Sequence, residues 1–275
     1  MLLIAITAAL STFFVGDTSL SVQSTDNYKL VWSDEFNKPG KVDTTVWQFE
    51  KGFVRNNELQ WYQQQNAWCE NGKLIIEARR EKLPNPGYKE GSNNYRESRK
   101  EINYTSASVN TRKTKAWKYG RFEIRAKIIA QPGLWPAIWT LGQKGEWPSN
   151  GEIDIMEYYK GDILANVATG TSERYKAKWF TTKKAYTSFN DPDWDKSFHT
   201  WRMDWDEHFI KLYMDDILLN EVSLNELKNP DGSNPFRQPH YLLLNLAIGG
   251  DNGGDPTNTA FPNRYEIDYV RVYQK

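Results

Sequence analysis

The chain has 275 residues, and its 35 lysines and arginines balance its 35 aspartates and glutamates. This length suits one large all-β domain, since β-sandwiches often reach about 200 to 250 residues undivided. The balanced charge lacks the basic excess typical of nucleic-acid-binding proteins, so we expect no nucleic-acid partner.

Aromatic residues make up 14% of the chain and include twelve tryptophans. Many of them are expected in the core, but an amphipathic ring also suits the apolar face of a sugar, so the excess favours a neutral sugar polymer as ligand. Cys69 is the only cysteine, which excludes an internal disulfide and a Cys-rich zinc site.

The N-terminal segment reads as a targeting signal followed by a linker. Residues 1–16 form an apolar run too short for a membrane span of about 20 residues, and they predict a secretory signal peptide, although no Lys or Arg precedes the run. Residues 17–27, rich in Ser, Thr, Asp and Asn, predict a flexible leader. We therefore expect a secreted or extracytoplasmic monomer with one domain over residues 28–275.

Short alternating runs bounded by Gly, Pro, Asn and Asp recur from Tyr28 onwards, which is typical of a β-sandwich. Asp215-Asp216 predicts a hairpin turn, residues 223–227 are the best helix candidate, and residues 81–100 predict a surface loop. The predicted strands are residues 30–32, 74–78, 106–109, 119–129, 137–141, 152–158, 200–205, 209–214, 241–247 and 265–273.

Residues 151–159 place three carboxylates among large apolar side chains. In a strand, Glu152 and Asp154 share one face, while Ile153 and Ile155 share the other. Strict alternation would send Glu157 to the isoleucine face. A β-bulge adds one residue and returns Glu157 to the acidic face, so the sequence predicts a bulged strand with three acids on its wet side.

Three like charges on one face repel, which favours a proton on at least one of them near neutral pH. Glycoside hydrolysis needs this combination: one ionised carboxylate at the reacting carbon and one protonated carboxyl at the leaving oxygen. Taken alone, the pattern also fits a solvated strand face or calcium ligation by oxygen ligands.

The surrounding motifs resemble glycoside hydrolase family 16, and within it the laminarinase-like and β-1,3(1,4)-glucanase branch. The resemblance covers roughly residues 28–274 and implies a concanavalin A-like jelly roll of two curved antiparallel sheets, with substrate across the concave sheet. The matching segments are Trp32-Ser33-Asp34-Glu35-Phe36, Tyr119-Gly120-Arg121-Phe122-Glu123, Gly133-Leu134-Trp135-Pro136-Ala137, residues 151–158, Phe198-His199-Thr200-Trp201, residues 244–250 and residues 267–273.

The resemblance implies roles for the three acids. Glu152 matches the family nucleophile, Glu157 the acid/base, and Asp154 the residue that orients and supports the nucleophile. Retention of configuration implies carboxyl groups about 5 to 5.5 Å apart. Four extended steps would span about 13 Å, so strand curvature and side-chain lean must bring the two glutamates together.

Other residues are expected to bind substrate. Trp135, Trp139 and Trp147 are candidate sugar platforms, although each also fits core packing. By resemblance, Asn56 hydrogen-bonds sugar hydroxyls on the non-reducing side. Arg79 is expected to do likewise from a neighbouring strand; either residue also fits a turn or surface position.

The remaining expectations concern support and metal binding. His199 is expected to support the acidic strand through a hydrogen bond. No cofactor is expected for catalysis. The resemblance implies a structural calcium held by Asp268 with the carbonyls of Glu35 and Gly72.

These observations predict a secreted endo-β-glucanase that cleaves internal linkages of laminarin-type β-1,3-glucan or mixed-linkage β-1,3/1,4-glucan with retention. The additional Met156 is shared by laminarinase-like, agarase and carrageenase members of the family and is absent from the lichenase-like group. An agarase-like galactan hydrolase and a non-catalytic glucan-binding lectin are the alternatives.

Overall fold

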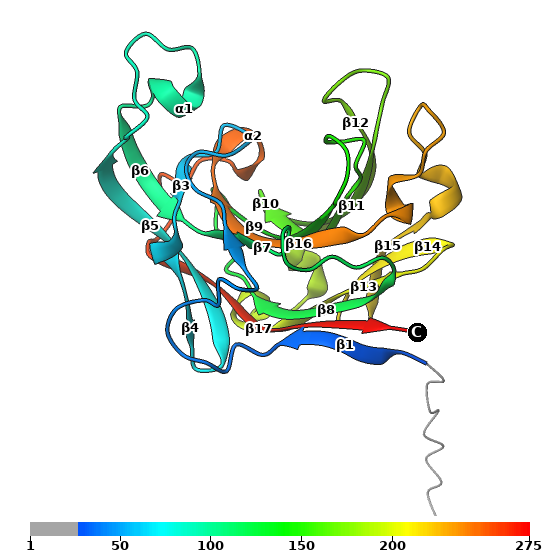
Figure 1. Cartoon of the computed structure of the whole chain (residues 1–275). Helices are drawn as coiled ribbons and strands as arrows, with labels where there is room; N and C mark the ends of the chain where they lie inside the picture. The colour runs from blue at the N-terminus through cyan, green and yellow to red at the C-terminus, as the bar shows by residue number, and fades with distance from the viewer. Residues whose placement is uncertain (1–26) are drawn as a thin grey trace, which may run out of the picture.

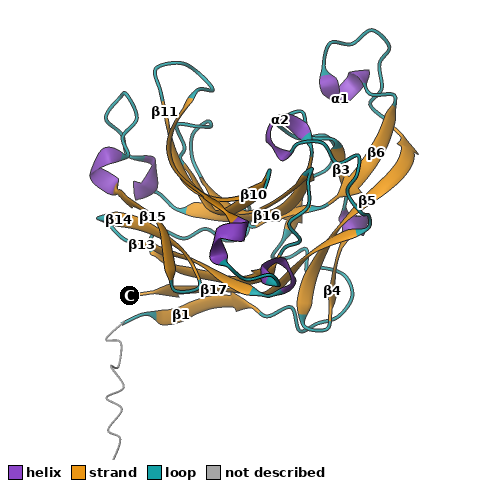
Figure 2. Ribbon diagram, turned by 180° about the vertical axis from the view of Figure 1, so that it is seen from behind, coloured by secondary structure: helices purple, strands orange, loops and turns teal. Residues whose placement is uncertain are grey.

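The computed structural model describes residues 27–275 as two large β-sheets packed face to face (Figures 1 and 2). The predicted signal peptide and all but the last residue of the predicted leader lie outside these residues. Among the described residues, no helix is long and apolar enough to cross a membrane.

The inner sheet has seven strands in the order β12-β11-β10-β9-β16-β7-β2, all antiparallel. Its concave face opens between the β12 edge on one side and the β3, β6 and α2 region on the other (Figure 1). The strands are β2 (Gln48–Phe49), β7 (Ser108–Asn110), β9 (Leu134–Gly142), β10 (Glu152–Tyr159), β11 (Asp162–Gly170), β12 (Ala177–Ala185) and β16 (His240–Ile248).

The outer sheet has ten strands in the order β15-β14-β13-β8-β17-β5-β6-β3, with β1 paired to β17 and β4 to β5. The short β3–β6 pair is parallel. The strands are β1 (Lys29–Asp34), β3 (Gln60–Tyr62), β4 (Ala67–Glu70), β5 (Lys73–Pro84), β6 (Glu101–Ser106), β8 (Gly120–Lys127), β13 (His199–Trp205), β14 (Phe209–Met214), β15 (Ile217–Ser223) and β17 (Asn263–Gln274).

Among residues 27–275, helical structure is confined to short segments between strands. The predicted helix at residues 223–227 is a 3₁₀ turn, η4 (Leu224–Glu226), capped by the Ser223 side chain. The others are α1 (Tyr95–Ser98), α2 (Gly250–Gly253), η1 (Gln64–Asn66), η2 (Tyr186–Phe189), η3 (Trp194–Lys196) and η5 (Pro235–Arg237).

The core lies between the sheets and follows the two-residue period of the strands. In the outer sheet, β13 alternates strictly and buries Trp201, Met203 and Trp205. From the inner sheet, Ile153 and Ile155 pack into the same core. The inner strands β9 and β16 are buried on both faces, because their second face is the floor of a cleft.

Two loop predictions have different outcomes. Met214 pairs with Ile217 and Asp215 adopts a left-handed φ of 52°, so the hairpin at Asp215-Asp216 is confirmed. The loop predicted at residues 81–100 starts later than expected, because β5 continues to Pro84; its other end is confirmed, because β6 begins at Glu101, and the connection contains the short helix α1. Pairing with β6 extends β5 beyond its apolar run.

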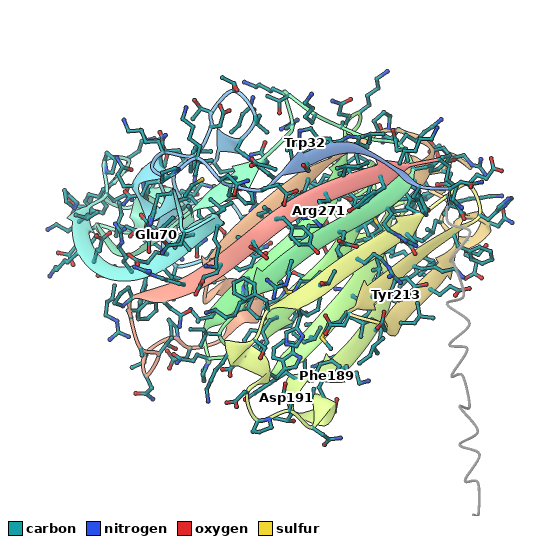
Figure 3. All side chains as sticks on the ribbon, turned by 90° about the horizontal axis from the view of Figure 1, so that it is seen from below. Trp32, Glu70, Phe189, Asp191, Tyr213 and Arg271 are labelled. Carbon is teal, nitrogen blue, oxygen red and sulfur yellow. The ribbon has the colours of Figure 1, made fainter. Side chains whose placement is uncertain are left out.

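Side chains, among them Arg271, cover the outward face of the outer sheet (Figure 3), and charged residues on its neighbouring strands form ion pairs. Arg121 binds Asp204 through two nitrogens at 2.6 and 2.9 Å, and Lys127 contacts Glu266 at 2.6 Å. Such opposite-charge pairs stabilise neighbouring strands modestly. This face therefore keeps its charges compensated and partly solvated.

Candidate active site

A cleft of about 870 Å³ runs over the concave face of the inner sheet. Glu152 and Glu157 from β10 line its middle. Arg55 and Asn56, which follow β2, line one side, and Trp179 on the edge strand β12 lines the other. The cleft thus lies over the strands β12, β11, β10, β9 and β16 and reaches the loop that follows β2.

The predicted bulge in β10 is confirmed. The register shifts between Asp154 and Glu157 against β11, and between Asp154 and Met156 against β9. Ile155 and Met156 consequently both enter the core with no exposed surface. The extra residue returns Glu157 to the face that carries Glu152 and Asp154, as the sequence pattern required.

The three carboxyl groups form one hydrogen-bonded cluster. Asp154 shares hydrogen bonds with both Glu152 and Glu157, so curvature of β10 and the lean of the side chains bring the acids together. The amide of Asn166, opposite Asp154 on β11, donates to Asp154 Oδ2 at 3.2 Å and to Glu157 Oε2 at 3.0 Å. Neutral donors complete the cluster: Trp147 Nε1 donates to Glu152, and Trp135 Nε1 donates to Glu157 at 2.8 Å.

Burial raises the pKa of all three acids, because it removes water from the charged form. The pKa of Glu157 rises to about 7, through burial first and the charge of Glu152 second. The pKa of Asp154 rises well above its ordinary value for the same reason, aided by the charges of both glutamates. Burial also raises the pKa of Glu152, against the hydrogen bond from Trp147 and the charge of Arg55. The cluster therefore retains a proton near neutral pH.

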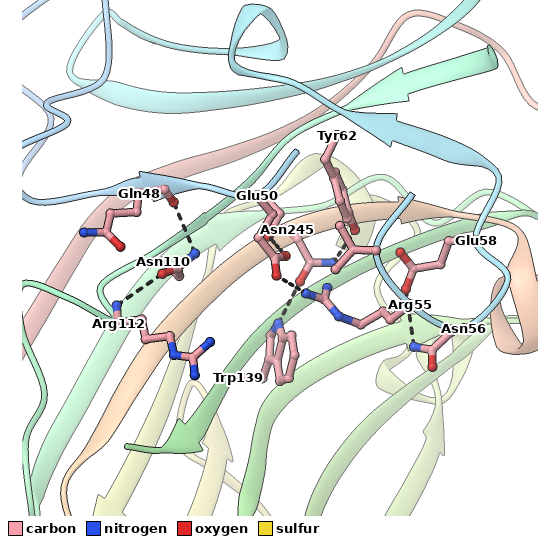
Figure 4. A network of polar contacts seen from close by, with 12 residues as sticks. Gln48, Glu50, Arg55, Asn56, Glu58, Tyr62, Asn110, Arg112, Trp139 and Asn245 are labelled. Carbon is pink, nitrogen blue, oxygen red and sulfur yellow. Dashed lines mark hydrogen bonds and ion pairs between the residues drawn. The ribbon is translucent and has the colours of Figure 1, made fainter. Parts of the chain in front are cut away.

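Arg55 and Asn245 support the floor of the cleft (Figure 4). The Arg55 guanidinium lies 5.1 Å from the centroid of the Trp139 ring and pairs with Glu50. Trp139 Nε1 donates to Asn245 Oδ1 at 2.7 Å, and Asn245 Nδ2 donates to the Tyr62 hydroxyl at 3.2 Å. These contacts fix the Trp139 ring beside Asp154, its register partner.

The structure brings most of the predicted substrate-binding residues to the cleft. Trp135, Trp139, Trp147 and Asn56 all line it. Asn56 sits in a left-handed turn with φ of 52°, and its amide donates to Glu58 at 3.3 Å. Each indole nitrogen among the three tryptophans binds a protein side chain, so a sugar would contact their rings rather than these nitrogens.

Arg79 does not line the cleft, so the prediction that it binds sugar hydroxyls there is wrong. It lies on β5 in the outer sheet, pairs with Glu77 at 2.7 Å, and lines a separate depression of about 380 Å³. Alternation places a residue on a strand face, but sequence alone did not show to which sheet the strand belongs.

The role predicted for His199 is also wrong. His199 begins β13 in the outer sheet, where its Nδ1 contacts Asp215 Oδ2 at 2.8 Å and its Nε2 contacts the Trp194 carbonyl at 2.9 Å. Both ring nitrogens are thus occupied away from the acidic strand. The imidazole instead joins η3 to the β14–β15 turn.

The predicted calcium site remains a prediction. Asp268 Oδ2 accepts a hydrogen bond from Arg125 at 2.6 Å, so a cation already neutralises this carboxylate. Within residues 27–275, no group of three or more acidic, histidine or cysteine side chains could hold a metal ion. A calcium ion would have to share Asp268 with Arg125 or displace it, and its other ligands would be the carbonyls of Glu35 and Gly72.

Sequence reasoning missed several cleft residues. Asn166 and Asn245 are single amides within otherwise apolar, buried strands. A lone polar residue in such a run has to find a partner, and this is the signal that would have found them. The sequence around Arg55, Glu58 and Trp179 shows no comparable signal.

Comparisons with known proteins agree with this geometry. The chain is 35% identical over 288 residues to a beta-glucanase of Rhodothermus marinus, which covers 98% of this chain and 94% of that protein. It is 34% identical to the laminarinase catalytic domain of Thermotoga maritima, with a TM-score of 0.75 over 90% of this chain and 98% of that one.

A third similar structure was reported with endo-acting O-glycanases that members of the human gut microbiota express to initiate mucin breakdown. It is 36% identical, with a TM-score of 0.82 over 91% of this chain and 92% of that one. The model of glycosyl hydrolases family 16 matches residues 55–271. The chain therefore belongs to glycosyl hydrolases family 16 and is a glycoside hydrolase.

Proposed function

We propose that the protein is an endo-β-glucanase that cleaves internal linkages of laminarin-type or mixed-linkage β-glucan with retention of configuration. The observation that carries the proposal is the cluster on β10. It combines Glu157, whose pKa is about 7, with Glu152, whose carboxylate is supported by an indole and by the charge of Arg55. One carboxyl can hold a proton at the pH at which the other is ionised.

In the first step, the Glu152 carboxylate attacks the anomeric carbon of the bound sugar. Glu157 donates its proton to the glycosidic oxygen as the bond to the leaving chain breaks, and a glycosyl ester of Glu152 forms. Trp135 and Asn166 hold Glu157 in place and stabilise the carboxylate left behind.

In the second step, the Glu157 carboxylate takes a proton from water, and the resulting nucleophile attacks the same carbon. The ester bond breaks and Glu152 is released as a carboxylate. Asp154 bridges both glutamates and orients them through the two steps. Its own raised pKa follows from burial beside two acids.

The shape and charge of the cleft support a neutral polymer cut internally. The cleft extends over five neighbouring strands of the inner sheet, so several sugars of a long chain fit along it. Its two arginines, Arg55 and Arg96, are engaged by Glu50 and by the carbonyls of Phe53 and Val54. A densely sulfated chain would find little uncompensated positive charge here.

The second candidate is a galactoside-containing chain, as in an agarase or an O-glycanase. It is favoured by one observation: of the two solved structures compared above, the one reported with O-glycanases has the higher TM-score, 0.82 against 0.75. The catalytic chemistry would be the same, and only the sugars in the cleft would differ.

The test is chromatographic product analysis with laminarin, barley mixed-linkage glucan, agarose and mucin in parallel, each with the wild type and Glu152→Ala. Oligosaccharides from the two glucans alone, absent with the variant, support the proposal. Products from agarose or mucin alone would replace it with the second candidate. Glucan binding without products from any polymer would indicate a lectin.

A further inference from the structure

The loop of residues 53–58, between β2 and β3, carries three residues of the cleft: Arg55, Asn56 and Glu58 (Figure 4). It lies outside the strands, so its backbone carbonyls are not paired along a sheet. Asn56 and Asn57 adopt left-handed φ angles of 52° and 51°, which residues other than glycine rarely adopt. Contacts from other parts of the chain must therefore hold this loop in its shape.

Two arginines donate to four of the six carbonyls of this loop. Arg96 donates through Nε and Nη2 to the carbonyls of residues 53 and 54, the first at 2.9 Å. Arg99 donates through Nη2 and Nη1 to the carbonyls of residues 57 and 58, the first at 2.7 Å. The two carbonyls between them accept from the backbone N–H groups of residues 58 and 251, at 3.1 and 2.9 Å. Every carbonyl of the loop therefore has a donor, and most of the donors are these two side chains.

The two arginines, which we call the arginine clamp, are themselves held in place. The Arg99 guanidinium lies 4.7 Å from the centroid of the Phe53 ring and 5.1 Å from that of Tyr95, and the Arg96 guanidinium lies 4.8 Å from that of Tyr95. The amide of the buried Asn85 donates to the carbonyls of Arg96 and Arg99 at 2.9 and 2.7 Å. Figure 1 shows α1, which contains Arg96, beyond the ends of β5 and β6 and on the same side of the cleft as β3 and α2.

We propose that Arg99 is a positioning residue for the non-reducing side of the cleft: with Arg96, it holds the 53–58 loop in the conformation that presents Asn56 to the substrate. This proposal rests on the proposed glucanase function. Arg99 lines a separate depression of about 510 Å³ and not the cleft, so it acts through the loop. Arg96 also lines the cleft, where it can contact a sugar itself. Substitution of Arg99 therefore isolates the effect of the clamp.

The test compares two donors that share a leaving group and differ in the sugars on the non-reducing side: 2,4-dinitrophenyl β-laminaritetraoside and 2,4-dinitrophenyl β-glucoside. Arg99→Lys keeps the charge but replaces a planar fork by one ammonium, which cannot reproduce both bonds. We expect its KM on the tetraoside to rise about tenfold with kcat unchanged, because the loop binds ground state and transition state alike. On the glucoside, which has a single sugar, kcat/KM should stay within about twofold of the wild type.

Two further measurements separate positioning from a general loss of stability. Hydrogen–deuterium exchange at the N–H groups of residues 58 and 59 should be faster in Arg99→Lys, while peptides from β10 exchange as in the wild type. The pH–rate profile should not move, because Arg55 is held separately by Glu50 and by the Trp139 ring.

The matched control is Arg80→Lys. Arg80 also donates to two backbone carbonyls, those of residues 256 and 257, at 3.0 and 2.8 Å, and its guanidinium contacts the rings of Tyr104 and Phe261. Residues 256 and 257 lie outside the lining of the cleft. The control should therefore change neither the rates on the two donors nor the exchange at residues 58 and 59.

Equal losses on both donors, or no loss on either, would overturn the positioning role, and so would unchanged exchange at residues 58 and 59. If the wild type cleaves no β-glucan, the proposed function fails separately. The exchange measurement then still tests the clamp, and the KM comparison moves to long and short dinitrophenyl glycosides of the oligosaccharide that the protein does release. A loss confined to the long glycoside would support the role of Arg99, and unchanged kinetics would refute it.

Discussion

The two sheets present carboxylates in opposite settings. On the convex face, Asp204 and Glu266 each contact a cation across a strand, at 2.6 Å in both cases, and Glu35 binds Arg271 at 2.9 Å. On the concave face, Asp154 is buried and Glu152 and Glu157 are half-buried, and these acids of β10 are bonded to indoles, to one amide and to each other.

This difference decides which acids can do chemistry. The hydrogen bond from Arg271 lowers the pKa of Glu35, so that carboxyl cannot hold a proton near neutral pH. Neutral donors orient a carboxylate without cancelling its charge. The acids of the β10 cluster therefore still repel one another, and this repulsion favours a proton on one of them. The outer sheet uses its charges for pairing between strands, and the inner sheet keeps them available for proton transfer.

The largest expected effect is on kcat, and it follows from removing the attacking carboxylate. Glu152→Gln should reduce kcat on the preferred polymer about 10⁴-fold or more, because the amide cannot form the ester. The matched charge removal on the convex face, Asp204→Asn, should leave kcat within about twofold. Steady-state rates of the two variants measure the contrast directly; comparable losses would mean that the two faces are not chemically distinct.

The next effect is on stability. Glu157 has a folded pKa of about 7 against an ordinary value of 4.5, so the folded state binds the extra proton between these values. Wild-type stability should therefore fall as the pH rises from 4.5 to 7, by up to about 3 kcal/mol from this residue.

Glu157→Gln has no such proton to lose, so its stability should vary less over that window and exceed that of the wild type above pH 7. Urea unfolding midpoints from pH 4.5 to 8 provide the measurement. Parallel curves for wild type and variant would show that Glu157 titrates normally.

A smaller change is expected from one indole. Trp135→Phe keeps the ring face and removes the donor to Glu157. A hydrogen bond to a charged group contributes about 1.5 to 3 kcal/mol, so kcat/KM should fall roughly tenfold. The lost donor favours the protonated acid, and the alkaline limb of the pH–rate profile should move up by about one unit. An unmoved limb would exclude Trp135 as a partner of the titrating acid.

The smallest expected effect is a change in stability on removing an ion pair from the convex face. Arg271→Ala removes a partly solvated pair with Glu35, whose side chains are 33% and 35% exposed. Pairs of this kind contribute less than about 1 kcal/mol. The urea midpoint should shift slightly and the pH–rate profile should not change. A shift in the profile would connect this face to the cleft.

Much of this architecture is predictable from local pattern. The alternation of apolar and polar residues in β13 matches the alternating burial of its side chains. The spacing of the acids in β10 predicts the bulge at Met156 in the same way. The core residues Ile153 and Ile155 followed from the same argument.

What local pattern could not show is which strands are neighbours. Asn166 reaches the acids from β11, a strand absent from the predicted set, and Asn245 reaches Trp139 from β16. Arg79 was expected to bind substrate and His199 to support the acidic strand, but both lie in the outer sheet and bind other partners. Register across strands depends on long-range packing, which one sequence does not display.

In the proposed mechanism, Glu152 attacks the sugar while Glu157 supplies the proton. A 2-deoxy-2-fluoro laminaribiosyl donor with a good leaving group slows the second step and traps the ester, and peptide mass spectrometry then locates it. We expect one adduct, on the peptide that carries Glu152 and at that residue. Turnover of the donor with no adduct, or an adduct on Asp154 or Glu157, would contradict it.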